Sequence, residues 1–543
     1  MRVIRSSLPP GAIFFFCLAQ VLIGCAEPRD FRELTEALKQ PDLVGGLELK
    51  LKGDEDLSVL GRFSNLRVLK LDGNGISPEQ SPGFRLPAEI KQLTKLRTLE
   101  LLAVHPELPP FPAQSLTELV IQYDKSVIAA GPRQNREARV LDLAGARKLR
   151  RLELVYHGHG IRLVGLEQLK RLNRLTLAHG TLLEIPAGLE KISDLRELAI
   201  THMKGLSIAP AGIEKQTKLH TLILTNNVLA ELPAGLKKLG KLTTLDASHN
   251  KLSELPPALG KLTGLQKLNV SRNQLVELPR EIARLKKLKE LHLDGNLLTE
   301  LPDNLHELRG ITHLRLSGNR FRRIPPVVFR FAWLDTLDLR DNLIATIPPA
   351  LTELPALRVL RLACNELQRL PTETELMKPL RVLDLDWNRL RDFPYVITRV
   401  VGLRRLSLKG NGIRTAPAAV SELAQLEELD LSHNLIHELP SEVGRLTLLK
   451  QLNLERNRFK FLPGGLGALP ALELLDIRGN PLRRYPSFLM KIPQTPRLLT
   501  DRRGARLMRR RGRSAFRKRY AKHLVVQESK RLRRKDFCAA APK

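Results

Sequence analysis

The chain has little of what holds small secreted scaffolds together: its 543 residues include 4 cysteines, and only 4% of them are aromatic. Four cysteines cannot staple a chain of this length, so a disulfide-dense scaffold is excluded. Charged residues make up 27% of the chain and the mean hydropathy is −0.17, which excludes a polytopic membrane protein. Hydrophobic residues reach 43%, enough for a continuous core, so a disordered chain is excluded as well.

Acidic residues are also in short supply. There are 57 Asp and Glu against 89 Lys and Arg, so the formal net charge is 89 − 57 = +32. Such an excess predicts an anionic neighbour, either a lipid surface, a nucleic acid or an acidic envelope polymer. Residues 497–543 alone contain 18 basic and 3 acidic residues, or 18 − 3 = +15, so the tail is the expected polyanion contact.

The N-terminus has the features of an export signal. Arg2 and Arg5 precede an apolar stretch over residues 11–24, whose 14 residues rise about 21 Å as a helix, short of a ~30 Å hydrocarbon core. The stretch ends in Leu22-Ile23-Gly24-Cys25, which resembles the lipobox of bacterial lipoprotein signal peptides. The resemblance implies lipidation of Cys25 and a membrane-anchored protein of the bacterial envelope, and Ala26 favours the outer membrane. An ordinary signal peptide or an uncleaved apolar N-terminus is the alternative.

The other cysteines are isolated in the sequence. Cys17 would leave with the signal peptide. Cys364 and Cys538 lie too far apart in sequence to suggest a pair, so we predict no disulfide between them.

A fixed period of 23 residues dominates the chain. Asparagine recurs at this step from Asn227 to Asn480, and proline keeps the same step from Pro210 to Pro486. In each unit a short stretch such as Leu268-Asn269-Val270 alternates apolar and polar residues, which predicts a strand with one buried face. After the proline the apolar spacing becomes three to four, which predicts a short helical return.

This pattern resembles the leucine-rich repeat family over roughly residues 44–492. The resemblance implies an α/β repeat solenoid: a curved horseshoe with a parallel concave sheet and short helical or irregular convex returns. The asparagine column is expected to form a hydrogen-bonded ladder between adjacent turns. About nineteen strands are predicted.

The chain therefore divides into five predicted parts. A signal peptide (1–24) is followed by an anchor, a linker and a cap helix beginning near Asp30 (25–43). Irregular repeats (44–218) come before regular 23-residue repeats and the end of the array (219–496). A basic tail (497–543) closes the chain and is expected to be either partly helical, with Phe516, Tyr520 and Leu524 spaced as one side of an amphipathic helix, or disordered and solvated.

Variable strand positions should project from the concave sheet. The middle of the array is the most heavily charged and includes a tryptophan, a mixture that suits a protein or peptide partner. The predicted partner-binding residues are Arg315, Arg340, Arg361, Asp384, Asp386, Trp387, Arg405 and Lys409. The predicted polyanion-binding residues are Arg509, Arg510, Arg511, Arg517, Lys518 and Arg519.

No phosphate-binding glycine loop, nucleophile elbow or complete metal-ligand set is visible, so no catalytic residue, metal or cofactor is predicted. The sequence favours a non-catalytic scaffold anchored to the membrane through lipidated Cys25, which binds a protein or peptide on its concave face. Its alternative is a cytoplasmic repeat scaffold whose basic tail binds nucleic acid or anionic membrane. Export would separate the chain from nucleic acid and leave anionic lipid or envelope polymer as the contact of the tail.

Overall fold

A computed structural model describes most of the chain. The described residues are 29–502, apart from 54, 75, 77–83, 105–107, 110–111, 124–138, 157–160, 181–187, 234 and 485–486, together with 504–506, 519–520, 522–527 and 538. The chain folds as two compact units: residues 1–206 with 210–219, and residues 207–209 with 220–543.

The first unit is a parallel sheet with short connections. Its strands are β1 (Arg29–Phe31), β2 (Val44–Lys50), β3 (Val68–Asp72), β4 (Thr98–Val104), β5 (Glu118–Tyr123), β7 (Arg151–Val155), β9 (Arg174–Ala178) and β10 (Glu197–Thr201). A separate parallel pair is formed by β6 (Arg139–Asp142) and β8 (Ile161–Val164). One α-helix, α2, spans Leu34–Ala37, and 3-10 helices span Pro41–Leu43, Leu57–Arg62, Ala88–Gln92, Leu166–Gln168, Leu189–Lys191 and Ile213–Lys215.

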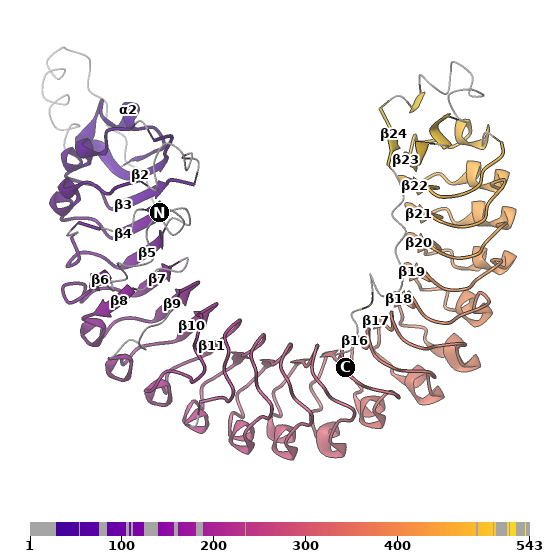
Figure 1. Ribbon diagram of the computed structural model, residues 1–543, viewed down its shortest axis with the longest axis horizontal. Helices are drawn as coiled ribbons and strands as arrows, with labels where there is room; N and C mark the ends of the chain where they lie inside the picture. The colour runs from indigo at the N-terminus through magenta and orange to yellow at the C-terminus, as the bar shows by residue number, and fades with distance from the viewer. Residues whose placement is uncertain are drawn as a thin grey trace, which may run out of the picture. The chain divides into compact units, whose positions relative to one another are not determined.

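The second unit is also parallel, with its strands side by side in chain order (Figure 1). They are β11 (Thr221–Ile223), β12 (Thr244–Asp246), β13 (Lys267–Asn269), β14 (Glu290–His292), β15 (His313–Arg315), β16 (Thr336–Asp338), β17 (Val359–Arg361), β18 (Val382–Asp384), β19 (Arg405–Ser407), β20 (Glu428–Asp430), β21 (Gln451–Asn453), β22 (Leu474–Asp476), β23 (Arg497–Thr500) and β24 (Leu524–Val526).

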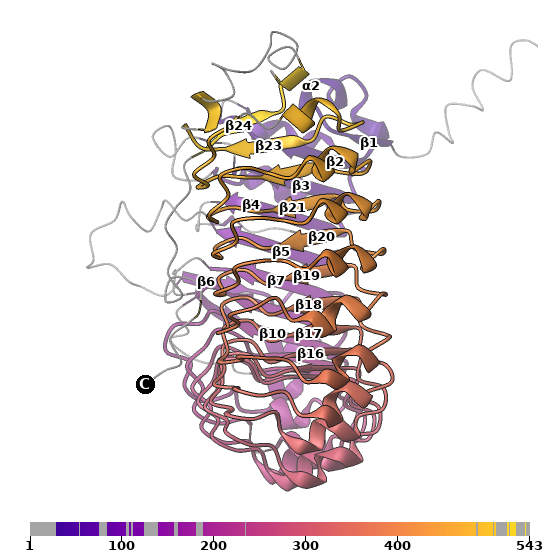
Figure 2. The same cartoon turned by 90° about the vertical axis from the view of Figure 1, so that its right-hand side faces the viewer.

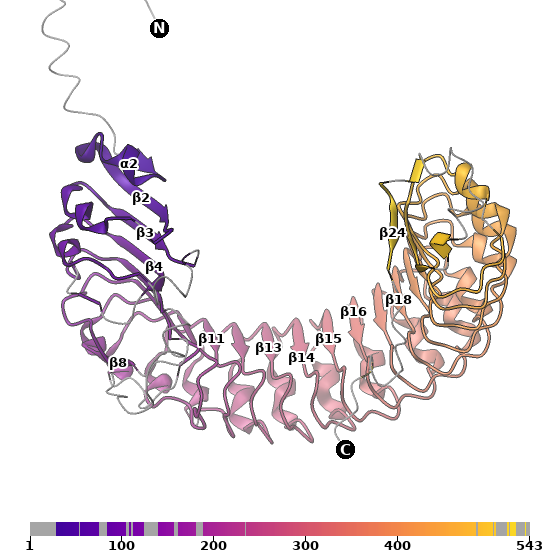
Figure 3. The same cartoon turned by 45° about the horizontal axis from the view of Figure 1, so that its top comes forward.

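Each strand from β11 to β22 is followed by a 3-10 helix on the side opposite the sheet (Figure 3). These helices span Leu236–Lys238, Pro257–Lys261, Arg280–Arg284, Asp303–Glu307, Pro326–Arg330, Pro349–Glu353, Thr372–Leu376, Tyr395–Arg399, Ala418–Glu422, Ser441–Arg445, Gly464–Ala468 and Ser487–Met490. Proline precedes most of them and sets φ for the turn, as at Pro279 with φ −68°. Five residues are too few for a stable α-helix, so the tighter form appears.

Strand register follows the 23-residue step. Leu268 faces Leu291, and Leu291 faces Leu314, so the same side chain of each repeat lies at the same height. All three leucines are fully buried. Figure 2 shows the strands β16 to β23 stacked one above another, which is how units that cannot bury their leucines alone share one core.

The predicted asparagine ladder is confirmed. The Nδ2 amide of Asn342 donates to the carbonyls of Leu316, Leu339 and Arg340 at 3.0, 3.0 and 3.1 Å, while its Oδ1 accepts from the amide of Phe321 at 3.1 Å. The same pattern recurs at Asn365 and Asn388. These buried amides satisfy backbone groups of neighbouring turns that would otherwise have no partner.

Two predictions at the ends of the array are wrong. Asp30 and Phe31 lie in strand β1, which pairs with β2, and α2 starts only at Leu34. The segment 497–543 is not simply a tail, because β23 and β24 extend the sheet beyond residue 496. Leu524 begins β24, so it does not continue a helix with Tyr520. Strand β1 pairs with β2 and strand β24 pairs with β23, so each covers an edge of the sheet that would otherwise be open.

Candidate binding surface on the second unit

The concave face of the second unit carries a hollow of about 330 Å³ between β17 and β22. Its floor is one register column in which each residue faces the next across the sheet. The column runs Arg361, Asp384, Ser407, Asp430, Asn453, Asp476. Short residues in the middle of the column leave the space, and longer residues beside them, such as Arg405 and Glu428, form its wall.

Three carboxylates of this hollow are held close together. Burial and the charges of Asp384 and Asp430 raise the pKa of Asp386 to about 8. Hydrogen bonds from Ser407 and Lys409 act in the opposite direction and lower this pKa. Burial raises the pKa of Asp384 and of Asp430 as well. The Oδ1 of Asp386 accepts from the Ser407 hydroxyl and from the Lys409 amide, the latter at 2.9 Å. The floor is therefore polar and rich in carboxyl groups, with Arg361 at its β17 end.

Four of the eight predicted partner-binding residues line the hollow: Arg361, Asp384, Asp386 and Arg405. The Nε of Arg405 lies 3.2 Å from the Oε1 of Glu428. The other four do not line it. The guanidinium of Arg340 donates three hydrogen bonds to Asp338, of 2.9, 3.1 and 2.6 Å, and Arg315 lies on β15, outside the lining. Lys409 donates to Asp386 through its backbone amide, and its charge opposes the rise in the pKa of Asp430.

Trp387 is buried and is not an anchor exposed to a partner. It lies in the turn after β18 with φ 52°, a conformation that glycine supplies at the equivalent Gly410. Its ring packs over Gly410, where a Cβ would collide with it, and lies 5.5 Å from the His433 ring. The sequence held a signal for this: Trp387 directly precedes the ladder residue Asn388, and that position lies in the turn and not on the strand.

Cys364 and Cys538 form a disulfide across 174 residues, which corrects the prediction that they are unpaired. The two sulfurs form a buried cluster with Trp387. Cys364 occupies the same turn position as Trp387, one repeat earlier, so the two side chains are neighbours. The pairing depends on where the chain end returns, which sequence spacing does not report.

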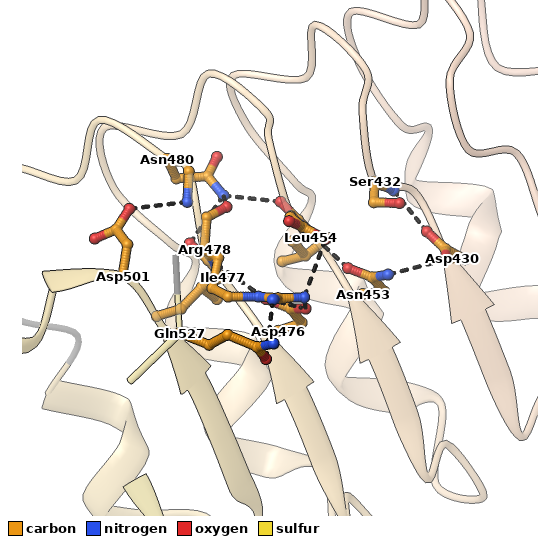
Figure 4. Close-up of polar contacts among 12 residues, drawn as sticks. Asp430, Ser432, Asn453, Leu454, Asp476, Ile477, Arg478, Asn480, Asp501 and Gln527 are labelled. Carbon is orange, nitrogen blue, oxygen red and sulfur yellow. Dashed lines mark hydrogen bonds and ion pairs between the residues drawn. The ribbon is translucent and has the colours of Figure 1, made fainter. Parts of the chain in front are cut away.

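A buried ion pair closes the C-terminal end of the surface (Figure 4). The Nη2 of Arg478 lies 2.6 Å from Asp476 and 3.1 Å from Glu455, and the three side chains are 14%, 5% and 12% exposed. Its Nη1 donates to the Oε1 of Gln527 at 3.3 Å, just after β24. Arg478 therefore joins β22 to the added strand and was not predicted as a site residue.

Six polar residues of the hollow were not predicted as site residues, although most continue the columns of predicted ones. They are Ser407, Glu428, Asp430, Gln451, Asn453 and Asp476. Charge density and one tryptophan selected the repeats from β15 to β19. The hollow lies further along because it forms where the column side chains are short.

Of the six predicted polyanion-binding residues, the structure describes Arg519, and this side chain is bonded to the protein itself. The guanidinium of Arg519 donates to the carbonyls of Met490 and Ile492 and to the Thr495 hydroxyl, so it ties down the chain end. Arg509, Arg510, Arg511, Arg517 and Lys518 lie outside the described residues, as does Cys25. In the described part, no helix is both long and apolar enough to cross a membrane.

One group of described residues has metal-ligand spacing: Asp341, Cys364 and Cys538, whose ligand atoms lie within 4.8 Å of one another. Its two sulfurs are joined in the disulfide. Metals bind the thiolate form, so this pair is not available as ligands while oxidised.

Replacing Asp386 with asparagine should stabilise the protein at neutral and alkaline pH. Because the folded-state pKa is raised, the folded chain binds the extra proton between about pH 4 and 8, and stability falls as pH rises through that window. Asp386→Asn should remove this dependence and add about 1–2 kcal/mol above pH 8. Thermal melts from pH 4 to 9 test this, with exposed Asp392→Asn as the control. A variant that melts at or below wild type at pH 9 contradicts it.

The parallel strands stack with equivalent residues of successive repeats in register, and an asparagine ladder joins their turns. Together these features define a solenoid built from repeats. Three leucine-rich repeat models match it: a leucine-rich repeat region over residues 378–498, a leucine-rich repeat model over 263–321, 309–363 and 332–390, and a two-copy leucine-rich repeat model over 240–282. Residues 240–498 therefore match leucine-rich repeat models, and the fold is a leucine-rich repeat solenoid. This fold commonly serves as a protein–protein interaction scaffold.

Solved structures share the fold. A leucine-rich repeat protein of Leptospira interrogans is 25% identical, with 87% of this chain and 99% of that chain covered and a TM-score of 0.53. A TDR receptor is 22% identical, with 90% of this chain and 91% of the receptor chain covered and a TM-score of 0.57. The ectodomain of an Arabidopsis thaliana membrane receptor kinase, in complex with Casparian strip integrity factor 2, is 24% identical, covering 84% and 58%, with a TM-score of 0.50. No curated protein matches the sequence.

Proposed function

We propose that this protein is a lipid-anchored envelope scaffold that binds a protein or peptide ligand in the hollow of its second unit. The hollow carries the proposal: it combines a polar floor, opposed charges on its wall and apolar strand residues at one place. Such a mixture gives a peptide both orientation and area to bury. The Arabidopsis ectodomain of the same fold, in complex with Casparian strip integrity factor 2, supports a ligand of this class.

The disulfide supports the exported location. Disulfides persist in oxidising compartments and are rare in reducing ones. The Cys364–Cys538 bond, buried against Trp387, therefore agrees with a chain whose first 25 residues resemble a lipoprotein signal. It counts against a cytoplasmic scaffold.

The anchor is tested by Cys25→Ala, with Cys17→Ala as the matched control. The proposal expects the first variant to leave the membrane fraction and the second to remain in it. The N-terminal mass of the mature protein gives an independent readout, since a lipidated Cys25 should be its first residue. An unchanged membrane fraction for Cys25→Ala contradicts the anchor.

The ligand surface is tested with peptides selected from a random library on the Cys25→Ser protein. Ser407→Arg places a long side chain in the hollow, and Ser441→Arg adds the same residue on an exposed 3-10 helix. Selected peptides should bind Ser407→Arg at least tenfold more weakly and Ser441→Arg as well as wild type. Equal binding to all three proteins, with unchanged melting, would place the ligand elsewhere.

A further inference from the structure

The first unit carries a hollow of its own, of about 620 Å³, at the N-terminal ends of β4, β5 and β7. Its walls are basic: Lys95 and Arg97 on one side, Lys148 and Arg150 on the other. Ser115 and Thr117 lie between them, and the other described lining residues are Arg67, Thr94 and Glu118. Short side chains between two pairs of long ones leave the space open.

Backbone hydrogen bonds hold these residues in one column. The amide of Arg97 donates to the Arg67 carbonyl at 2.8 Å, that of Thr117 to the Arg97 carbonyl at 2.8 Å, and that of Arg150 to the Thr117 carbonyl at 2.7 Å. Arg97 and Arg150 are thus two strand spacings apart, about 10 Å. A group narrower than this gap can be contacted by both arginines at once.

The cations of the hollow are not neutralised. Among the residues that the structure describes, no carboxylate oxygen lies within 4.0 Å of the side-chain nitrogens of Arg97, Lys148 or Arg150. Lys95 donates to the Asn65 amide oxygen at 2.7 Å, which leaves its charge uncompensated. The one acidic residue of the lining, Glu118, lies 3.9 Å from Arg151. Among the described lining residues, five exposed cations, the four of the walls and Arg67, face a space with one carboxylate.

The floor contributes room but no donors. The Ser115 hydroxyl donates to the Pro112 carbonyl at 3.0 Å, and the Thr117 hydroxyl donates to the Arg97 carbonyl at 3.1 Å. A ligand is therefore held by the guanidinium and ammonium groups. Guanidinium groups match the oxygens of a phosphate in pairs.

We propose that this hollow binds the phosphate monoester of a small soluble ligand, of the size of a sugar phosphate. A monoester carries about −1.5 to −2 charges at pH 7 and three acceptor oxygens, so it can use cations from both walls, whereas a carboxylate has one charge. Ligand pockets for small molecules are about 300–1,000 Å³, so this volume admits the carrier as well as the phosphate.

Isothermal titration with glucose 6-phosphate at low salt tests the site, with glucose as the uncharged control. Wild type should bind the phosphate ester and not glucose. The double variant Arg97→Gln/Arg150→Gln should bind at least tenfold more weakly, and Arg97→Lys/Arg150→Lys, which keeps the charge without the paired donors, should fall between. All four positions in the walls are exposed, so melting should not change.

A matched control removes the same charge elsewhere: Arg322→Gln/Arg323→Gln, two exposed arginines of the second unit. It should bind glucose 6-phosphate as wild type does. Equal weakening in both double variants would show a general charge effect and overturn the site. Phosphatidylglycerol vesicles form the other arm: binding to vesicles that needs Arg97 and Arg150, without binding of glucose 6-phosphate, would replace the soluble ligand by a lipid surface.

Discussion

Replacing Arg478 with alanine is expected to destabilise the C-terminal repeats by about 3–5 kcal/mol. The substitution leaves Asp476 and Glu455 buried with no cation between them, and removes the contact to Gln527 after β24. An uncompensated buried charge costs far more than an exposed ion pair contributes. Arg478→Lys keeps the charge but not the paired donors, so we expect a smaller loss.

Local measurements suit this test because repeat arrays need not unfold in one step. Hydrogen exchange should speed up in β21 to β24 and change little in β11 to β14. Arg458→Ala, at an exposed arginine one repeat earlier, is the control and should behave as wild type. Unchanged exchange in β22 and β24 would show that the ion pair does not hold the end of the sheet.

Removing the disulfide is expected to have an effect of similar size. Cys364→Ser/Cys538→Ser opens a loop of 174 residues, and the entropy of closing a loop of that length is worth about 5 kcal/mol in the chain-entropy model. Both cysteines also cover Trp387, so its indole should become wetter when the bond is absent.

Tryptophan fluorescence gives a clean readout, since the chain has two tryptophans and Trp333 is already 68% exposed while Trp387 is 7% exposed. Reductant should shift the wild-type emission to the red and lower the urea midpoint. The double variant should match reduced wild type and ignore the reductant. A wild type indifferent to reductant in both readouts would contradict the structural role of the bond.

The repeat architecture was predictable because its causes are local. Each strand, turn and 3-10 return is determined by residues within one 23-residue step, so Leu291 or Asn342 can be placed from its neighbours alone. The ladder followed for the same reason. The ends of the array were less predictable, since β1 and β24 have no repeat signature and form only because an open sheet edge is available to them.

The candidate sites show the limit of the strand pattern. It placed Arg361, Asp384 and Asp386 on one face, and the structure brings them together. The strand pattern did not show that Trp387 lies in the turn, one residue before Asn388, and not on the strand. It also did not identify Arg478, whose charge is neutralised by Asp476 and Glu455. The depth of a hollow and the neutralisation of a charged side chain both depend on the side chains in adjacent repeats. These neighbours can be identified only once the strand register is known.

The sequence by itself determined the period, the parallel strands and the asparagine ladder of this protein, because each arises from contacts inside one repeat or between identical positions of adjacent ones. Only the tertiary structure decided the Cys364–Cys538 bond, the added strands, the acidic hollow and the basic hollow. The disulfide and the basic hollow join residues whose spacing follows no fixed period. The acidic hollow keeps the 23-residue step, but its depth depends on the side-chain lengths in adjacent repeats, so it forms only after the repeats have stacked.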